Sequence, residues 1–305
     1  MKIDRRKFIA ALAAGTAHLM FTPLYANNVY PSEALNPLQK IKLGNTGIET
    51  TLLGYGTGVH GGYRTSFLTR QDHAKSVATL VKAYEQGIRF FDLADTYGTH
   101  GIMKEALKSM NREELTLSSK IWTRSGGIPE PKEERPDADV VVDRFRKELD
   151  TDVIDLIQIH CMVDENWTDE EKKQMDILEN LKAKGIIRAH GTSVHSLEAM
   201  QKAAATDWVD VLHARINPYG IAMDRNDPKE VIDVLKQIKE GGKGIIGMKL
   251  IGDGQYRDNS EKINHALKFV LGLNLVDMLI VGFENNDEVE NYLGRMEKTL
   301  IGLNS

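Results

Sequence analysis

The chain has 305 residues, of which 41% are hydrophobic and 27% are charged, a balance that fits a globular protein and excludes a largely disordered one. Its formal net charge is −5 and no basic stripe stands out, which argues against nucleic acid or an anionic membrane as the main partner. Cys161 is the only cysteine, so an internal disulfide is excluded.

The first 26 residues have the pattern of an export signal. The pair Arg5-Arg6 precedes an apolar run over residues 8–21, and Tyr25-Ala26-Asn27 offers a small-residue cleavage point. The apolar run is too short to cross a bilayer. Paired arginines in this setting resemble the bacterial twin-arginine signal, with Asp4 in place of the commoner serine or threonine.

A signal over residues 1–26 predicts that the twin-arginine export machinery carries the protein to the periplasm. Cleavage would leave no stable membrane anchor, and residues 27–40 would form an N-terminal linker. It would remove four basic residues and one acidic residue, which moves the net charge from −5 to −8. The alternative, an amphipathic N-terminal helix, is disfavoured by the break at Pro23.

Beyond Ile41, short β-branched or apolar runs alternate with helical patterns. The runs predict strands over residues 51–55, 89–93, 115–119, 153–159, 186–192, 209–214, 244–248 and 276–281. The stretches between them predict helices over residues 70–86, 101–110, 137–149, 169–184, 196–204, 229–239, 260–271 and 287–298. Eight strand–helix units without a dividing linker predict one domain, a (β/α)8 TIM barrel over residues 41–305.

Gly56-Thr57-Gly58-Val59-His60-Gly61 matches the G-x-G-x-x-G pattern of dinucleotide-binding Rossmann folds and follows a strand. In that fold the motif opens directly into a helix. Here no apolar helical spacing begins before about Arg70, so we reject the Rossmann interpretation. The glycines are expected to allow a flexible loop or the close approach of a cofactor, which makes Gly56 and Thr57 candidate cofactor contacts.

Four reactive side chains stand where predicted strands end. Asp92 and Tyr97 follow one strand, Lys120 follows the next, and His160 ends the third. Because the carboxyl ends of barrel strands share one rim, we expect a carboxylate, a phenol, an amine and an imidazole to meet there. Taken singly, Asp92 and Lys120 fit a structural ion pair, and His160 fits an ordinary buried polar group. Taken together, their order favours catalysis.

The four groups form a chemically coherent set. An ammonium beside a phenol stabilises the phenolate, and a carboxylate keeps the ammonium charged and in place. An imidazole can orient a carbonyl oxygen by a hydrogen bond. This set suits the protonation of an oxygen while a hydride arrives at carbon.

At these positions the chain resembles the aldo/keto reductase family. The matching segments are Phe91-Asp92-Leu93-Ala94 with Tyr97-Gly98, Ser119-Lys120, and Gln158-Ile159-His160, and the resemblance extends from about Ile41 to Leu293. It implies that Asp92, Tyr97, Lys120 and His160 are a catalytic tetrad. It also implies NADP(H) or NAD(H) as cofactor and a small-molecule carbonyl or alcohol as substrate, reduced by hydride transfer with Tyr97 as general acid. The loop over residues 122–136 and Trp167 are expected to shape the substrate pocket.

The resemblance also implies contacts to the nicotinamide. Gly191-Thr192-Ser193 is similar to the family's Gly-x-Ser-Asn segment, in which the serine and asparagine hold the carboxamide; Ser193 matches, whereas Val194 replaces the asparagine. His213 stands where the family often has a glutamine with the same role. Met248 stands where a ring-stacking aromatic is usual, and its thioether can pack on a ring or in the core.

At the adenosine end, the resemblance makes Asn291 a candidate adenine contact and Lys249 a candidate phosphate contact. Gly282 and Glu288 occupy positions where lysine and arginine often bind the 2′-phosphate of NADP. The choice between NAD and NADP therefore stays open.

Two other classes of function stay open as well. A metal-dependent TIM-barrel hydrolase would also place Asp and His at strand ends, but the sequence has no H-x-H or H-E-x-x-H pattern. An exported nicotinamide-nucleotide sensor or maturation protein without turnover fits the departures at Val194 and Met248, whereas the intact tetrad argues against it.

Overall fold

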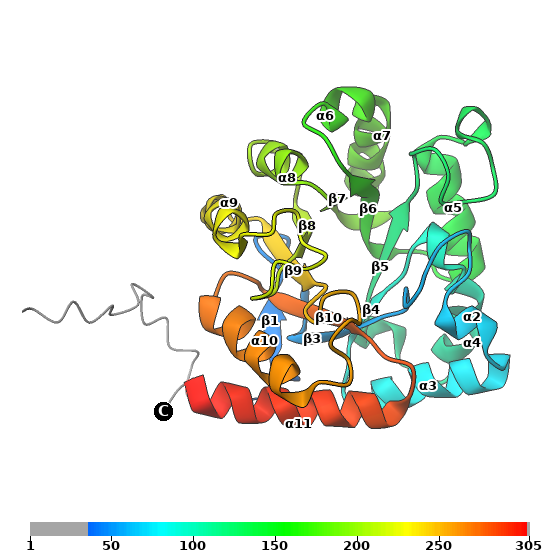
Figure 1. The fold of residues 1–305 in the computed structure, drawn as a ribbon. Helices are drawn as coiled ribbons and strands as arrows, with labels where there is room; N and C mark the ends of the chain where they lie inside the picture. Colours follow the sequence, from blue (N-terminus) through cyan, green and yellow to red (C-terminus); the bar gives the residue numbers. More distant parts are fainter. Residues whose placement is uncertain (1–35, 304–305) are drawn as a thin grey trace, which may run out of the picture.

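Eight parallel strands closed into a barrel form the centre of the molecule, and helices surround them (Figure 1). The computed structural model describes residues 36–303, so the expected export signal lies outside the described residues. The strands pair in chain order, and the last pairs with the first to close the ring. They are β3 (Leu53–Gly56), β4 (Phe90–Asp92), β5 (Thr116–Ile121), β6 (Ile154–Met162), β7 (Ile187–Val194), β8 (Val211–Arg215), β9 (Gly244–Met248) and β10 (Met278–Gly282). The predicted TIM barrel is confirmed.

Helices follow the strands and pack one face against them. They are α2 (Phe67–Arg70), α3 (His73–Glu85), α4 (His100–Leu107), α5 (Ala138–Leu149), α6 (Trp167–Glu170), α7 (Lys172–Ala183), α8 (Leu197–Ala204), α9 (Pro228–Glu240), α10 (Ser260–Leu273) and α11 (Asn286–Leu303). In α9 the buried residues recur at helical spacing, as Val231, Val234, Leu235 and Ile238. Asp227 caps this helix by accepting from the Lys229 N–H, and Pro228 starts it.

Two predicted helices differ in the structure: one begins later than predicted, and one is divided. The stretch 70–86 becomes α3 alone, because Asp72 caps its start by accepting from the Lys75 N–H, and the short α2 before it shares only Arg70 with the predicted stretch. The stretch 169–184 becomes α6 and α7, with the break at Glu171. The other helices agree with the prediction to within a few residues at their ends.

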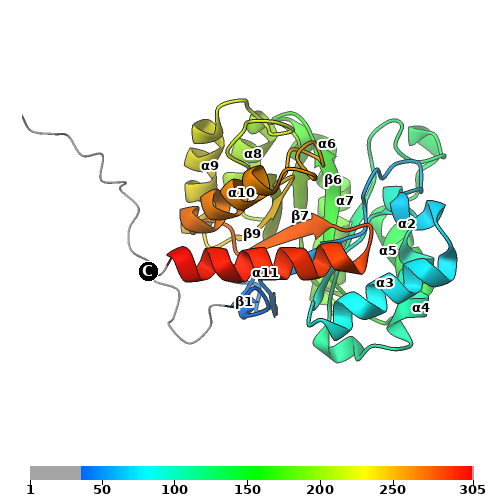
Figure 2. The same cartoon turned by 60° about the horizontal axis from the view of Figure 1, so that its bottom comes forward.

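An antiparallel hairpin of β1 (Lys40–Lys42) and β2 (Glu49–Thr51) precedes the barrel (blue, Figure 2). It contributes Leu43 and Ile48, both fully buried, to the cluster of apolar side chains inside the barrel. The strands contribute the remaining buried members of that cluster: Phe90, Leu156, Ala189, Val211, Ile246 and Met278. The hairpin therefore closes the amino end of the barrel.

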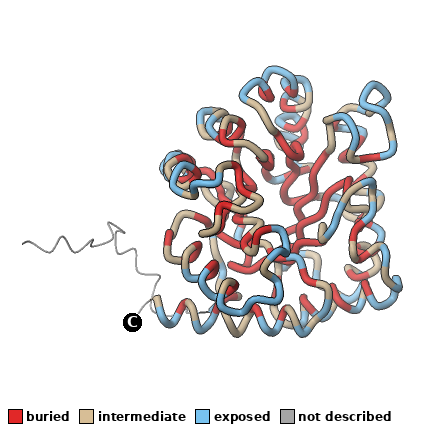
Figure 3. The backbone as a smooth tube through the Cα atoms, viewed as in Figure 1, coloured by how far each residue is buried: buried red, intermediate tan, exposed pale blue. Residues whose placement is uncertain are grey.

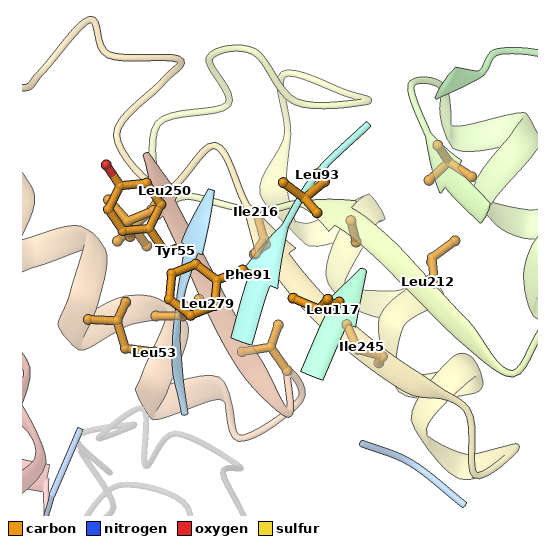
Figure 4. Close-up of a cluster of buried hydrophobic side chains, with 14 of the residues drawn as sticks. Leu53, Tyr55, Phe91, Leu93, Leu117, Leu212, Ile216, Ile245, Leu250 and Leu279 are labelled. Atoms are coloured by element: carbon orange, nitrogen blue, oxygen red, sulfur yellow. The ribbon is translucent and has the colours of Figure 1, made fainter. Parts of the chain in front are cut away.

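Strand side chains alternate between this inner cluster and a larger outer one. Phe91 and Leu117 belong to the outer cluster, which fills the space between strands and helices (Figure 4). Buried segments accordingly follow the strands, while exposed segments follow the outer faces of the helices (Figure 3).

Among residues 36–303, no helix is long and apolar enough to cross a membrane.

Alternation also decides which polar side chains enter the barrel. Phe90 points inward, so Asp92, two residues later, has the same direction. The same count from Leu156 directs His160 inward, and the count from Val211 directs His213 inward. Because strand side chains alternate, these inward positions form a ring of polar groups next to the apolar cluster inside the barrel.

Candidate active site

The four residues expected to act together lie at the carboxyl ends of three neighbouring strands. Asp92 ends β4, Lys120 lies one residue before the end of β5, and His160 lies near the end of β6. Tyr97 ends the short 3-10 helix η1 (Asp95–Tyr97) that follows β4. Lys120 Nζ lies 5.4 Å from the centre of the Tyr97 ring, and the ring centres of Tyr97 and His160 are 5.7 Å apart. The structure therefore brings all four together.

Lys120 and Asp92 form a buried ion pair. The exposed fraction of Lys120 is 1% and that of Asp92 is 2%. Lys120 Nζ also donates to the Leu93 carbonyl at 3.1 Å. His213 Nε2 lies 3.2 Å from Asp92 Oδ1. Burial alone would raise the pKa of Asp92, but the charge of Lys120, with the contact to His213, outweighs it and lowers that pKa. Asp92 is thus an ionised carboxylate that holds the ammonium in place.

The Tyr97 phenol carries its proton firmly. Burial, followed by the negative charge of Asp92, raises the pKa of Tyr97 well above its usual value of 10.0. This differs from the expected lowering by Lys120, because the ammonium is already paired with Asp92. No residue between 36 and 303 forms a hydrogen bond with the Tyr97 hydroxyl, so the proton is free for another acceptor.

His160 is held as a neutral imidazole. Burial, with the charge of Lys120 as a smaller cause, lowers the pKa of His160 well below 6.5. Its Nδ1 is buried and has no hydrogen-bond partner among the described residues. The Trp122 ring packs edge-on against it, with the ring centres 5.2 Å apart. A neutral imidazole keeps one donor and one acceptor at neutral pH.

The glycine-rich loop over residues 56–61 packs against Tyr97. A Cβ atom on Gly58 would lie 2.5 Å from Tyr97 Cζ, and one on Gly61 would lie 2.7 Å from Tyr97 Cδ1. These two glycines therefore make room for the phenol ring. The sequence predicts that these glycines allow a flexible loop or the approach of a cofactor, and it does not predict their packing against Tyr97.

The two loop residues expected to touch a cofactor have defined places. Gly56 ends β3 and pairs in register with Gly282 at the end of β10. Thr57 is buried, and its Oγ1 donates to the Asp92 carbonyl at 2.8 Å and contacts Thr99 Oγ1 at 2.8 Å. Thr57 thereby ties the loop to the strand end that carries Asp92.

The residues expected at the nicotinamide lie on β7, β8 and β9. Ser193 is buried, and its Oγ accepts from the Cys161 N–H at 2.8 Å. His213 lies against Asp92, directly beside the tetrad. Met248 is partly buried at the end of β9, opposite Arg215 of β8. These three side chains lie at the same end of the barrel as Tyr97.

The residues expected at the adenosine end lie farther along the chain. Lys249 follows β9 with a left-handed backbone (φ 58°), and its amine pairs with Asp253. Asn291 is exposed on α11, where its Oδ1 accepts from Arg295. Lys249 therefore adjoins the rim, and Asn291 lies on α11, which follows the last strand of the barrel.

Gly282 and Glu288 also have structural partners. A Cβ on Gly282 would lie 2.3 Å from Val59 Cγ2, so Val59 would have to shift to admit a longer side chain there. Glu288 accepts from the Glu284 N–H at 2.8 Å and pairs with Arg257 at 2.7 Å. Arg257 also pairs with Glu284. One guanidinium thus faces two carboxylates at the start of α11.

An ion-pair network around η1 was missed by sequence reasoning. Asp95, which is 4% exposed, accepts from Arg64 Nε at 2.9 Å and from Arg144 Nη2 at 2.7 Å. Arg144 also pairs with Glu148 at 2.9 Å. Asp95 stands two residues before Tyr97, so these arginines fix the turn that presents the phenol. The signal was Asp95 itself, a second carboxylate three residues after Asp92.

Trp167, expected to shape the substrate pocket, is instead a core residue. It is 1% exposed, and its Nε1 donates to the Ala199 carbonyl at 3.3 Å. Within the described part of the chain, no group of three His, Cys, Asp or Glu side chains is suited to hold a metal ion.

Comparison with known proteins places these features in a family. The model of the aldo/keto reductase family matches residues 52–269. A protein from Glycine max named probable aldo-keto reductase 1 is 28% identical over 223 residues, which cover 71% of this chain and 60% of that protein. The NADH-specific methylglyoxal reductase of Escherichia coli strain K12 is 24% identical over 224 residues, covering 67% of this chain and 68% of that protein.

A solved structure agrees with the fold. The putative aldo-keto reductase from Pseudomonas aeruginosa superposes with a TM-score of 0.69 at 23% identity, covering 86% of this chain and 96% of that one. The match of the family model spans β3 to α10 and includes all four residues of the rim cluster around Tyr97. The chain belongs to the aldo/keto reductase family.

Proposed function

We propose that the protein is an NAD(P)(H)-dependent oxidoreductase that reduces an aldehyde or a ketone to an alcohol, with Tyr97 as the general acid. The observation that supports this most is a protonated phenol without a hydrogen-bond partner among residues 36–303, packed beside a buried ammonium–carboxylate pair and a neutral imidazole. These are the groups needed to protonate a carbonyl oxygen.

The rim residues fit a nicotinamide dinucleotide. Met248 offers a partly buried, polarisable side chain beside the tetrad, and Lys249 next to it offers a cation for a phosphate. Ser193 lies on the neighbouring inner wall. When bound, the reduced nicotinamide supplies a hydride to the carbonyl carbon.

Side chains of the protein supply the proton and orient the carbonyl oxygen that receives it. His160 orients the carbonyl oxygen toward Tyr97, and the Tyr97 hydroxyl gives its proton to the oxygen as negative charge develops there. An alkoxide is a stronger base than a phenolate, so the transfer is favourable even with a raised pKa on Tyr97. The phenolate that results lies next to Lys120, whose charge stabilises it while Asp92 keeps the ammonium in position.

We propose that the enzyme accepts NAD(H) as well as NADP(H). Glu284 and Glu288 place carboxylates at the start of α11, and Gly282 offers no cation for a 2′-phosphate. The Escherichia coli relative named NADH-specific is consistent with NADH use in this family. Calorimetric titration of both cofactors should give dissociation constants within about tenfold, or 1.4 kcal/mol. A preference above about 10³-fold for NADP(H) would contradict this assignment.

The reaction itself is tested by following the oxidation of NADH and NADPH with a panel of aldehydes and ketones. Turnover with at least one carbonyl compound is expected. Tight nucleotide binding without turnover of any compound would instead favour a sensor or maturation protein.

We also propose that residues 1–26 direct the protein to the periplasm through the twin-arginine machinery. Replacing Arg5 and Arg6 by lysine should leave the precursor in the cytoplasm. Normal amounts of processed protein in the periplasm after that change would exclude this route.

A further inference from the structure

Three cations converge on the rim beside His160. They are Arg124 in the loop after β5, Arg215 at the end of β8, and Lys249 after β9, and we refer to them as the rim cations. Burial, followed by the charges of all three, lowers the pKa of His195 to about 3. Burial raises the pKa of the Cys161 thiol, and the charges of the same three cations oppose that rise. All three cations therefore face the same part of the rim.

Two of the rim cations are neutralised and the third is not. Arg215 Nε donates to Asp224 Oδ1 at 2.8 Å, and Lys249 pairs with Asp253. Arg124 Nη1 donates to the Cys161 carbonyl at 3.1 Å and to its Sγ at 3.4 Å. Within residues 36–303 no carboxylate lies within ion-pair distance of Arg124. Arg124 therefore supplies an uncompensated positive charge in a chain that is acidic as a whole.

Arg124 is positioned close to the reacting groups. Its guanidinium lies 5.9 Å from the centre of the Trp122 ring, and that ring packs against His160. Its hydrogen-bond partner Cys161 directly follows His160 in a left-handed conformation (φ 70°), in the irregular part of β6. Arg124 thus contacts both neighbours of the imidazole that would orient the substrate.

We propose that Arg124 anchors a carboxylate on the substrate, so that the preferred substrates are aldehydes or ketones that carry a carboxylate group. This rests on the proposed function. A single planar guanidinium matches a carboxylate through two parallel hydrogen bonds. A phosphate dianion would need further free charge, and the other two rim cations are already paired. Arg124 is a specificity-determining residue and takes no part in proton transfer.

The test uses two aldehydes of the same shape, 4-carboxybenzaldehyde and its methyl ester. In Arg124→Gln the KM for the acid should rise by about tenfold or more, because a charge-assisted pair is lost. The KM for the ester should stay within about twofold, and Arg124→Lys should restore part of the loss with the acid. Arg188→Gln is the control, because it removes the same charge at the amino end of β7, where Arg188 is 45% exposed. Equal effects of Arg124→Gln on both aldehydes would overturn the proposal.

A second measurement separates the substrate from the cofactor. Calorimetry with NADH and NADPH should give the same dissociation constants for wild type and Arg124→Gln. If both constants rise instead, Arg124 holds a cofactor phosphate and the proposal is wrong. If wild type reduces neither these two aldehydes nor any other carbonyl compound of the panel, the proposed function fails, and titration with terephthalate still tests the anchor. Binding to wild type that is lost in Arg124→Gln supports it, whereas equal binding to both, or binding to neither, rejects it.

Discussion

The two ends of the barrel are built from the same strands but hold opposite chemistry. At the amino end, Leu43 and Ile48 of the hairpin complete an apolar cluster with inward residues of the strands. At the carboxyl end, the next inward positions hold Asp92, Lys120 and His213 in a charged cluster. Burial is similar at both ends, so the two ends differ in the polarity of their residues and in how those residues are paired.

The comparison teaches where stability and activity reside. Apolar side chains at the amino end gain free energy from burial, at roughly 25 cal/mol per Å² of apolar surface. Buried charges at the carboxyl end contribute little net stability even when paired. Substitutions at the amino end should therefore change the free energy of unfolding. Substitutions at the carboxyl end that leave no buried charge unpaired should change turnover alone.

The largest effect is expected for Tyr97→Phe. This change removes the transferable proton and keeps the ring that packs on Gly58 and Gly61, so kcat should fall by about 10² to 10⁴. Unfolding and cofactor binding should be unchanged, because the hydroxyl forms no hydrogen bond with any residue from 36 to 303. Tyr63→Phe, at a residue that is 63% exposed, is the control. Near-normal turnover by Tyr97→Phe would remove Tyr97 from the mechanism.

Lys120→Met would affect both properties. It leaves the Asp92 carboxylate buried beside His213 without its ammonium, which should cost about 3–5 kcal/mol in the free energy of unfolding. The kcat should also fall, because no charge then stabilises the phenolate. Urea unfolding and steady-state kinetics measure the two effects. Lys147→Met, at a side chain that is 76% exposed, should change neither. Wild-type stability in Lys120→Met would show that the carboxylate is not buried as an ion.

Leu43→Ala tests the opposite end. Leu43 is fully buried against the inner cluster, so its truncation should cost about 2–5 kcal/mol of stability. The kcat at a temperature where the variant is folded should equal that of wild type. Val140→Ala, at a residue that is 56% exposed, is the matched surface control. A large loss of kcat in folded Leu43→Ala would mean that the two ends are coupled.

The smallest effect is expected for Gly58→Ala. The added methyl would lie 2.5 Å from Tyr97 Cζ, so the phenol must shift, and kcat should fall by about tenfold because the geometry of proton transfer is disturbed. Gly62→Ala is the control in the same loop, since nothing lies within 4 Å of its added methyl. Equal kinetics for the two variants would show that the loop yields easily and does not position the ring.

The fold was predictable because the alternation of strands and helices is local and regular. The meeting of Asp92, Tyr97, Lys120 and His160 at one rim was predictable for the same reason, since each of them lies at or just beyond a strand end. The contact between His213 and Asp92 was not, because it joins β8 to β4 across the barrel. The packing of Gly58 on Tyr97 also escaped prediction, since the sequence reveals a glycine but not what lies against it.

The seam of the barrel has a consequence for biosynthesis. Parallel pairing of β10 with β3, from Leu279 with Leu53 to Gly282 with Gly56, joins the last strand of the barrel to the first. Until β10 leaves the ribosome, β3 and β9 both present unpaired backbone edges of the kind that invite wrong pairing. The ring of strands that carries Asp92, Lys120 and His160 therefore closes only after synthesis is nearly finished.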